Sequence, residues 1–309
     1  MNLNEKIVKN VIEYRCLHDT LNIINIAYGI DDNYARCMAT SIASFCINNK
    51  DKNFCFYIVA SDLSDKTKIK LKVLAKDYNI NIIIYEINKD FFRDMPIIHE
   101  ISLATYFRIL LPNLVLNVDK LYYIDADIIC LKDADSFFCI NLEDNIIAAV
   151  PDSEKMNNKR NKALNLGQHI YFNAGILIID IEKWNNNKIS DKILTVINKY
   201  KNIIKYEDQD ALNIVLSKKV KYISKIFNCI TLSDVDNKEI ILLHFANHPK
   251  PWNKDWPLNV MYNEFSKNLY RQLENETPWK NSPLENNNSY KNKIKWRLKN
   301  ILFKLGYVK

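Results

Sequence analysis

Strand-like and helical patterns alternate over residues 22–87, and this alternation limits the possible folds more than any other feature of the sequence. The strand-like segments are NIINIAYG (22–29), NFCFYIVASD (53–62) and NINIIIYEI (79–87), all rich in β-branched or aromatic residues. Residues 34–48 and 66–78 carry apolar side chains at helical spacing. Regular alternation of strand and helix predicts a mostly parallel sheet with crossover helices, which binds ligands at the carboxyl ends of its strands.

Two aspartates one residue apart follow a later strand-like segment, LYYI at 121–124. Alternate residues of an extended chain face the same way, so Asp125 and Asp127 can converge on one point at the end of the strand. Two bare carboxylates there would repel each other, whereas a hard divalent ion accepts both and leaves room for phosphate oxygens. An Asp-rich turn is the simpler interpretation of an isolated Asp-X-Asp, so the other motifs of the chain decide between the two.

Glycine is rare in this chain, which has four, at positions 29, 167, 175 and 306. This distribution excludes a Gly-X-Gly-X-X-Gly dinucleotide fingerprint and a P-loop, so any nucleotide is held in another way. The formal net charge of +7 is also uneven, because residues 286–309 contain seven basic residues and no acid. The rest of the chain is therefore formally neutral, and we expect no nucleic acid partner.

The length of 309 residues suits one large α/β domain, or one domain with an appendage. Seven cysteines are scattered, without a Cys-X-X-Cys pair, which is typical of free thiols in a reducing compartment. The first residues, MNLNEKIVKNVIEYRC, contain no apolar signal core, and no apolar run approaches the roughly 20 residues of a membrane span. We therefore expect a cytoplasmic protein.

Several polar residues have two interpretations at this level. Arg108 lies among apolar residues in a predicted helix at 101–113, either as a surface arginine with a buried stem or as a charge aimed into a site. Asp152 ends a predicted strand, and the polar segment at 156–168 is typical of a loop or mobile helix that covers a site. A lone strand histidine such as His244 is more often a hydrogen-bonded core residue than a metal ligand.

Two more segments carry weaker signals. Gly175 lies inside a predicted strand at 171–180, which indicates a close backbone approach at that point. Acids begin the predicted helix at 207–216, where they favour the helix dipole, and taken alone they indicate capping.

The character of the chain changes from about residue 258, where a predicted helix and a Pro/Asn/Ser linker lead to a basic amphipathic helix. Its apolar stripe consists of Ile294, Leu298, Ile301, Leu302 and Leu305, bordered by lysines and Trp296. Such a helix either binds a membrane surface or packs on the body with a solvated basic edge. We favour the membrane surface, because acids are absent.

Six segments in order resemble glycosyltransferase family 8: AYGIDDNYA, ISLATYFRILLP, LYYIDADII, YFNAGILIID, DQDALN and HFANHPKPW. The lipopolysaccharide-core glucosyl- and galactosyltransferases are the most similar members, and they share the opening NIAYGID and a motif like TPWKNSPL. The resemblance implies a GT-A fold over residues 1–257, followed by a helical, membrane-associating region at 258–309. It also implies a retaining hexosyltransferase that uses a UDP-sugar donor and Mn²⁺ (or Mg²⁺).

The resemblance assigns roles to individual positions. The implied metal ligands are Asp125, Asp127 and His244. The implied uridine loop contains Gly29, Asp31, Asn33 and Tyr34. The implied contacts to the donor sugar are Arg108, Asp152, Asn173, Ala174 and Gln209. Lys250 is the implied diphosphate lysine, and Asp208 lies in the implied catalytic segment. Asn247 departs from the family pattern, which has glycine there, so this loop must adopt a similar backbone shape with Asn247 or shift its contacts to the diphosphate.

Retention of configuration requires either a covalent nucleophile or attack from the side of the departing phosphate. Gln209 is a poor nucleophile, so we expect front-side attack with Gln209 steadying the developing cation, and Asp208 as the alternative nucleophile. Lys250 and the metal would stabilise the leaving diphosphate. The expected acceptor is a sugar of the lipopolysaccharide core, reached from the inner face of the plasma membrane, where the tail binds anionic lipid.

Other functions remain open. The transferase could serve a lipooligosaccharide, another surface glycan or a glycoprotein, or the same fold could bind a nucleotide sugar without catalysis. A self-glucosylating scaffold like glycogenin is weakly disfavoured by the basic tail. A haloacid dehalogenase-type hydrolase would need its Asp pair after the first strand and Thr or Val where this chain has Ile129, so it is disfavoured.

Overall fold

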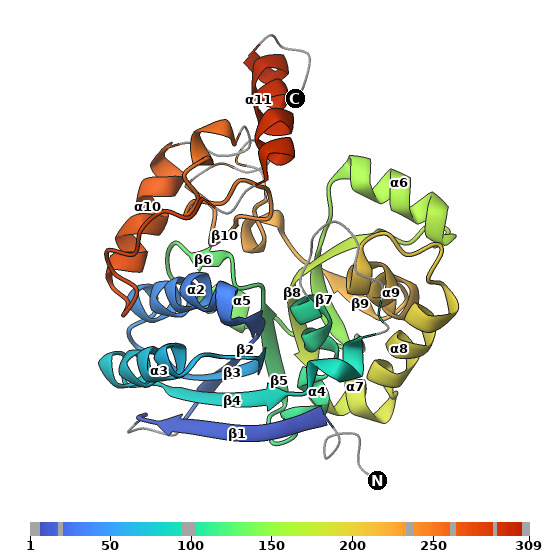
Figure 1. Ribbon diagram of the computed structural model, residues 1–309. Coiled ribbons are helices and arrows are strands. Elements are labelled where there is room, and N and C mark those ends of the chain that lie inside the picture. Colours follow the sequence, from blue (N-terminus) through green and yellow to red (C-terminus); the bar gives the residue numbers. More distant parts are fainter. Residues whose placement is uncertain are drawn as a thin grey trace.

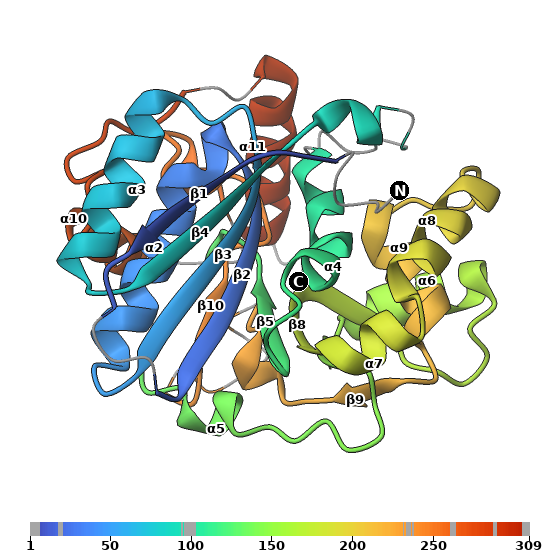
Figure 2. The same cartoon turned by 90° about the horizontal axis from the view of Figure 1, so that it is seen from below.

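A computed structural model describes residues 7–17, 21–93, 95, 103–230, 232, 236, 238–259, 264–286 and 289–304. An eight-stranded mixed sheet lies at its centre, in the order β1-β4-β3-β2-β5-β8-β7-β9 (Figures 1 and 2). Its strands are β1 (Val8–Arg15), β2 (Ile23–Asp31), β3 (Asn53–Ser61), β4 (Asn81–Ile87), β5 (Lys120–Ile124), β7 (Ile147–Pro151), β8 (Phe172–Asp180) and β9 (Val220–Tyr222). A separate antiparallel pair joins β6 (Ile128–Cys130) to β10 (Leu242–His244).

The sheet is mostly parallel, as the alternating pattern predicted. Strands β4, β3, β2 and β5 are joined by parallel pairing, and β7 pairs in parallel with β9. Strand β8 runs antiparallel between β5 and β7, and β1 is antiparallel at the edge beside β4. The sequence analysis did not predict β1, because most of its residues are polar and none of its side chains is fully buried.

Helices cover both faces of the sheet, and alternate strand residues separate two hydrophobic clusters. In β2, Ile26, Tyr28 and Ile30 join the cluster that includes α2 (Ala35–Asn48) and α3 (Asp65–Asp77). Ala27 joins the cluster on the other face. The helices in this second cluster are η3 (Leu103–Ile109), α4 (Leu111–Leu114), α7 (Ile181–Asn186), α8 (Ile189–Lys199) and α9 (Glu207–Leu216).

One helical prediction needs correction. The expected helix at 101–113 is, over its described part, the 3₁₀ helix η3 followed by the single turn α4, and residues 101 and 102 lie outside the described part. Of the two forms expected for the polar segment at 156–168, the structure shows a helix over most of it: α6 (Glu154–Leu164), whose N-terminus is capped by Ser153. Helices α7 and α8 are separate because Lys188, between them, adopts a left-handed conformation with φ 51°.

The C-terminal part of the chain packs against the rest of the protein. Helix α10 (Glu264–Asn275) packs on α2, where the buried Arg36 and Glu274 form an ion pair. Helix α11 (Tyr290–Lys304) stands beyond it at the top of Figure 1 and contacts the 3₁₀ helix η5 (Trp256–Leu258). Among the described residues, no helix is long and apolar enough to cross a membrane.

The apolar stripe predicted for α11 faces away from the body. Its described members are between 41% and 56% exposed, and they are Ile294, Leu298, Ile301 and Leu302. Leu305 lies outside the described residues. Trp296, in contrast, is only 9% exposed and faces inward.

Candidate active site

A cleft of about 1140 Å³ opens at the carboxyl ends of β2 and β5. Every residue to which the family resemblance assigned a role lines this cleft: Gly29, Asp31, Asn33, Tyr34, Arg108, Asp125, Asp127, Asp152, Asn173, Ala174, Asp208, Gln209, His244 and Lys250. These residues come from loops and strand ends far apart in the sequence. The structure thus brings them together at one place, while their individual roles remain predictions.

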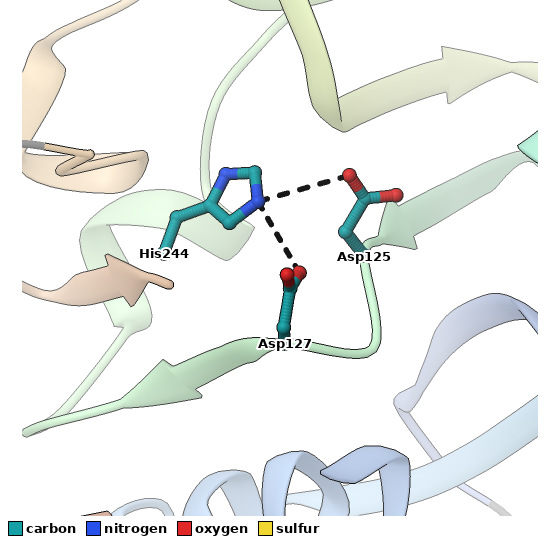
Figure 3. Close-up of side chains that lie close together, drawn as sticks. All are labelled: Asp125, Asp127 and His244. Carbon is teal, nitrogen blue, oxygen red and sulfur yellow. Dashed lines mark ion pairs between the residues drawn. The ribbon is translucent and has the colours of Figure 1, made fainter. Parts of the chain in front are cut away.

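Asp125, Asp127 and His244 form a compact group with ligand atoms within 4.8 Å of one another (Figure 3). The two aspartates flank the turn between β5 and β6, and β10 places His244 opposite Ile128. His244 Nε2 is 3.2 Å from Asp127 Oδ1 and 3.8 Å from Asp125 Oδ2. Two carboxylates and an imidazole nitrogen that converge in this way fit a divalent cation such as Mn²⁺.

A hydrogen bond at the ring nitrogen that does not face the carboxylates fixes the orientation of His244. Its Nδ1 lies 2.8 Å from Asn228 Oδ1, and the Asn228 amide donates to Asn173 Oδ1 at 2.8 Å. Gly175 allows the ring to approach, because a Cβ at this position would lie 2.5 Å from His244 Cε1. The close backbone approach predicted at Gly175 is therefore the contact of β8 with the histidine. A hydrogen bond at one ring nitrogen leaves the other directed at the carboxylates.

Lys250 provides a positive charge beside the same carboxylates. Its Nζ is 2.6 Å from Asp127 Oδ2 and also donates to the carbonyl of Phe245. Burial favours the neutral form of Asp127, but Lys250 and then His244 outweigh it, so the pKa of Asp127 lies well below its ordinary value. Asp127 is therefore an anion that is ready to bind a cation.

Arg108 is directed into the site, which decides between the two interpretations of the sequence. The guanidinium is buried, 3.1 Å from Asp125 Oδ1 and 2.8 Å from Asp208 Oδ2. It also lies 4.5 Å from the centre of the Tyr123 ring. Arg108 thus connects the end of β5 to the start of α9.

Asp208 is the least favourably placed charge of the site. Burial raises the pKa of its carboxyl group, and the opposing effects of Arg108 and of the Thr105 hydroxyl, which donates to Oδ1 at 2.6 Å, do not cancel this effect. This carboxylate is therefore held at the base of the cleft at some cost in stability.

The amide group of Gln209 is held on both sides. Its Oε1 accepts from Asn173 Nδ2 at 3.2 Å and from the Ala174 backbone at 3.0 Å. Its Nε2 donates to Asp152 Oδ2 at 3.2 Å and to the Tyr171 hydroxyl at 3.1 Å. Four hydrogen bonds leave the side chain little freedom to rotate, so Gln209 is presented to the cleft in one orientation.

The loop after β2 also lines the cleft. The side chain of Asp31 accepts hydrogen bonds from the backbone of Asn33 at 3.1 Å and of Tyr34 at 3.3 Å, and so shapes the turn. Gly29 packs closely under η3, where an added Cβ would be 3.0 Å from the Ala104 carbonyl oxygen. The ring of Tyr34 meets Trp252 edge-on with centroids 6.2 Å apart.

Sequence reasoning missed several residues of the site. Asn228 lies outside the six family segments, and Thr105 lies within ISLATYFRILLP but had no assigned role, so only the contacts described above reveal them. Trp296 was expected at the border of a membrane-facing stripe but lines the cleft. Its helical position opposite Ile294 and Leu298 is the signal that could have indicated an inward face.

Residues 25–256 match the family described as Glycosyl transferase family 8. The chain belongs to this family. It is therefore a glycosyltransferase, and its α/β fold with a mostly parallel sheet confirms the fold class expected from the sequence.

Named relatives of the family 8 chain include two enzymes of lipopolysaccharide synthesis. A lipopolysaccharide 1,2-glucosyltransferase of Escherichia coli K12 is 31% identical, and the match covers 94% of this chain and 88% of the relative. A lipopolysaccharide 1,3-galactosyltransferase of Salmonella typhimurium is 28% identical, with 91% and 87% covered. The crystal structure of the galactosyltransferase LgtC with donor and acceptor sugar analogs superposes with a TM-score of 0.72 at 22% identity, covering 87% of this chain and 100% of that one. This similarity to LgtC is evidence for the fold alone.

Proposed function

We propose that this family 8 enzyme transfers glucose or galactose from a UDP-sugar to a sugar of the lipopolysaccharide core, with retention of configuration. The observation that carries the proposal is the convergence of Asp125, Asp127 and His244 within 4.8 Å, with Lys250 beside them. This arrangement suits a nucleoside diphosphate, whose charge needs both a cation and a lysine. The named relatives, which act on lipopolysaccharide, supply the acceptor class and both candidate hexoses.

The metal group fits Mn²⁺ or Mg²⁺, with Asp125, Asp127 and His244 as ligands. When bound, the ion would neutralise charge on the diphosphate as the bond to the sugar breaks. Lys250 is already buried beside Asp127, so its ammonium group can move to a phosphate oxygen over a short distance. The uridine would lie on the loop from Gly29 to Tyr34, which lines the same cleft.

We expect front-side attack, in which the acceptor hydroxyl approaches beside the departing diphosphate and a phosphate oxygen takes its proton. The hydrogen bonds of Gln209 to Asn173, Ala174, Asp152 and Tyr171 support this assignment, because a fixed neutral amide can steady a developing cation. Asp208, the alternative nucleophile, is engaged by Arg108 and Thr105, and it would have to leave both to attack.

A substitution tests the role of Gln209. Gln209→Ala should retain less than a tenth of the wild-type turnover, with UDP binding unchanged. More than a tenth of the turnover would contradict the role. If a covalent glycosyl adduct on Asp208 were found by mass spectrometry, front-side attack would be wrong.

UDP release in the presence of Mn²⁺ tests the function itself. UDP-glucose, UDP-galactose and their N-acetyl forms are compared with and without a deacylated, truncated lipopolysaccharide acceptor, with Asp127→Ala as the control. We expect acceptor-dependent release from one hexose donor and loss of release in the variant. UDP binding without release from any donor would instead favour a nucleotide-sugar binding protein.

We further propose that the enzyme works on the cytoplasmic face of the inner membrane, with residues 258–309 as its membrane-associating region. The supporting observation is the exposed apolar stripe of α11, defined above, on a helix with no acidic residue. Apolar side chains flanked by lysines bind anionic lipid surfaces. Within this region α10 packs on the body, and α11 carries the apolar stripe that would meet lipid.

A further inference from the structure

Helix α11 contributes one wall of the active-site cleft. Asn292, Lys295 and Trp296 all line it. The Trp296 ring is stacked parallel to the ring of His248, with an interplanar angle of 5° and centroids 6.3 Å apart. At 9% exposure, Trp296 is the most deeply buried of the α11 side chains that the structure describes, whereas the described members of the apolar stripe face solvent. The inward face of α11 is thus part of the enzyme site.

Helix α6 stands opposite this wall. Its residues Lys155 and Met156 also line the cleft. Helices α6 and α11 therefore both border the cleft, and Figure 1 shows them as two separate helices above the sheet.

The cleft has room for more than a nucleotide sugar. Its volume of about 1140 Å³ exceeds the roughly 300–1,000 Å³ typical of a pocket for one small ligand. The residues with assigned donor roles come from the ends of β2, β5 and β7, the start of β8, η3, α9, and the end of β10 with the segment after it, and none comes from α6 or α11. The part of the cleft that α6 and α11 border is therefore available for a second molecule.

We propose that Trp296 forms the wall of the acceptor subsite and packs against the face of the acceptor sugar. The inference rests on the proposed function, because front-side attack requires the acceptor beside the departing diphosphate. Trp296 stacks on His248, which lies two residues before Lys250, the lysine assigned to the diphosphate. The tryptophan is therefore on the side of the cleft where we expect the diphosphate. A flat apolar ring suits the C–H face of a pyranose, and Asn292 and Lys295 offer hydrogen-bond donors to its hydroxyls.

The acceptor subsite and the membrane-docking stripe therefore occupy opposite faces of one helix. The stripe, proposed above to meet lipid, consists of side chains that do not line the cleft. The two properties can consequently be separated by point substitution, whereas deletion of the helix would remove both.

The test compares Trp296→Ala and Trp296→Phe with Tyr290→Ala, a matched control that removes an aromatic ring from the same helix. Tyr290 is 75% exposed and lies outside the cleft. Transfer to deacylated lipopolysaccharide of truncated core is measured without vesicles or detergent, together with the donor KM for UDP-hexose hydrolysis. We expect Trp296→Ala to raise the acceptor KM at least tenfold and the donor KM less than twofold. Trp296→Phe should recover part of the loss, and Tyr290→Ala should behave like the wild type.

An unchanged acceptor KM in Trp296→Ala, or an equal rise in the donor KM, would overturn the inference while leaving the proposed function intact. Absence of transfer by the wild-type enzyme would instead overturn the proposed function. If Trp296→Ala unfolds, Asn292→Ala carries the same test on the same wall, with an expected rise in acceptor KM of several-fold. No rise in that variant would count against the subsite.

Discussion

The buried ion pair between Arg160 and Asp210 stabilises the part of the chain that holds the active site. Removing this ion pair tests how the site is supported. Asp210 is fully buried and accepts five hydrogen bonds. They come from Arg160 Nε at 3.0 Å and Nη2 at 2.5 Å, the Tyr171 hydroxyl at 2.7 Å, and the backbone N–H groups of Lys205 at 2.7 Å and Tyr206 at 3.1 Å. Asp210→Asn keeps the shape of the side chain but replaces one acceptor oxygen with a donor.

The expected loss of stability is large. In Asp210→Asn, an NH₂ group must face N–H donors, and Arg160, which is 1% exposed, keeps a buried charge without a counter-ion. Breaking a buried pair in this way costs about 3–5 kcal/mol. With an unfolding entropy of about 2.1 cal/mol/K per residue, Tm should fall by about 5–8 °C for a chain of 309 residues.

Thermal unfolding at neutral pH measures this effect, with Asp62→Asn as the control. Asp62 makes an ion pair of 2.7 Å with Lys89, but both side chains are 55% exposed. Such surface pairs contribute about 0–1 kcal/mol, so the same chemical change should lower Tm by less than about 2 °C. The double variant Arg160→Met/Asp210→Leu should recover much of the loss, because it removes both charges.

A fall in Tm for Asp210→Asn no larger than that for Asp62→Asn would refute the reasoning. A second readout follows from the hydrogen bond between Gln209 and the hydroxyl of Tyr171, which itself donates to Asp210. The released tyrosine should loosen Gln209, so we expect kcat to fall more than the affinity for UDP.

Three further predictions concern other parts of the molecule. Asn228→Ala should weaken Mn²⁺ binding about 10–100-fold by calorimetry, because His244 loses the bond that orients it, and unchanged affinity would show that Asn228 is not needed. Asp208→Asn should raise Tm at pH 7, because it removes a buried carboxylate while Arg108 keeps Asp125 as a counter-ion. Burial raises the pKa of the Asp208 carboxyl group, so this group lowers the stability of the folded state as pH rises from its unfolded-state pKa through its folded-state pKa. The gain in Tm from Asp208→Asn should therefore vanish at acidic pH. A lower Tm of this variant at pH 7 would contradict the prediction. Leu298→Ser/Ile301→Ser should reduce sedimentation with anionic vesicles at least fivefold without changing transfer to a water-soluble acceptor, and full vesicle binding would refute the role of the stripe.

The core of the fold could be predicted because its signals are local. The strands and helices between residues 22 and 87 follow from side-chain periodicity, which each segment carries by itself. The edge strand β1 escaped prediction because its pairing with β4, rather than an apolar pattern, makes it a strand. The 3₁₀ geometry around Arg108 also escaped; in the structure η3 packs closely on Gly29, a contact between distant segments that no local pattern encodes.

By itself, the sequence determined the α/β class and the Asp-X-Asp at the end of a strand, and its resemblance to family 8 indicated many, but not all, of the residues that line the cleft. Only the tertiary structure decided how those residues are held. The link from His244 through Asn228 and Asn173 to Gln209 joins four segments of the chain, and no local pattern encodes such contacts. The same reason applies to α11. Helical periodicity separated its apolar stripe from Trp296, but which of the two meets the body depends on where the cleft lies, and this is set by the folding of the rest of the chain around it.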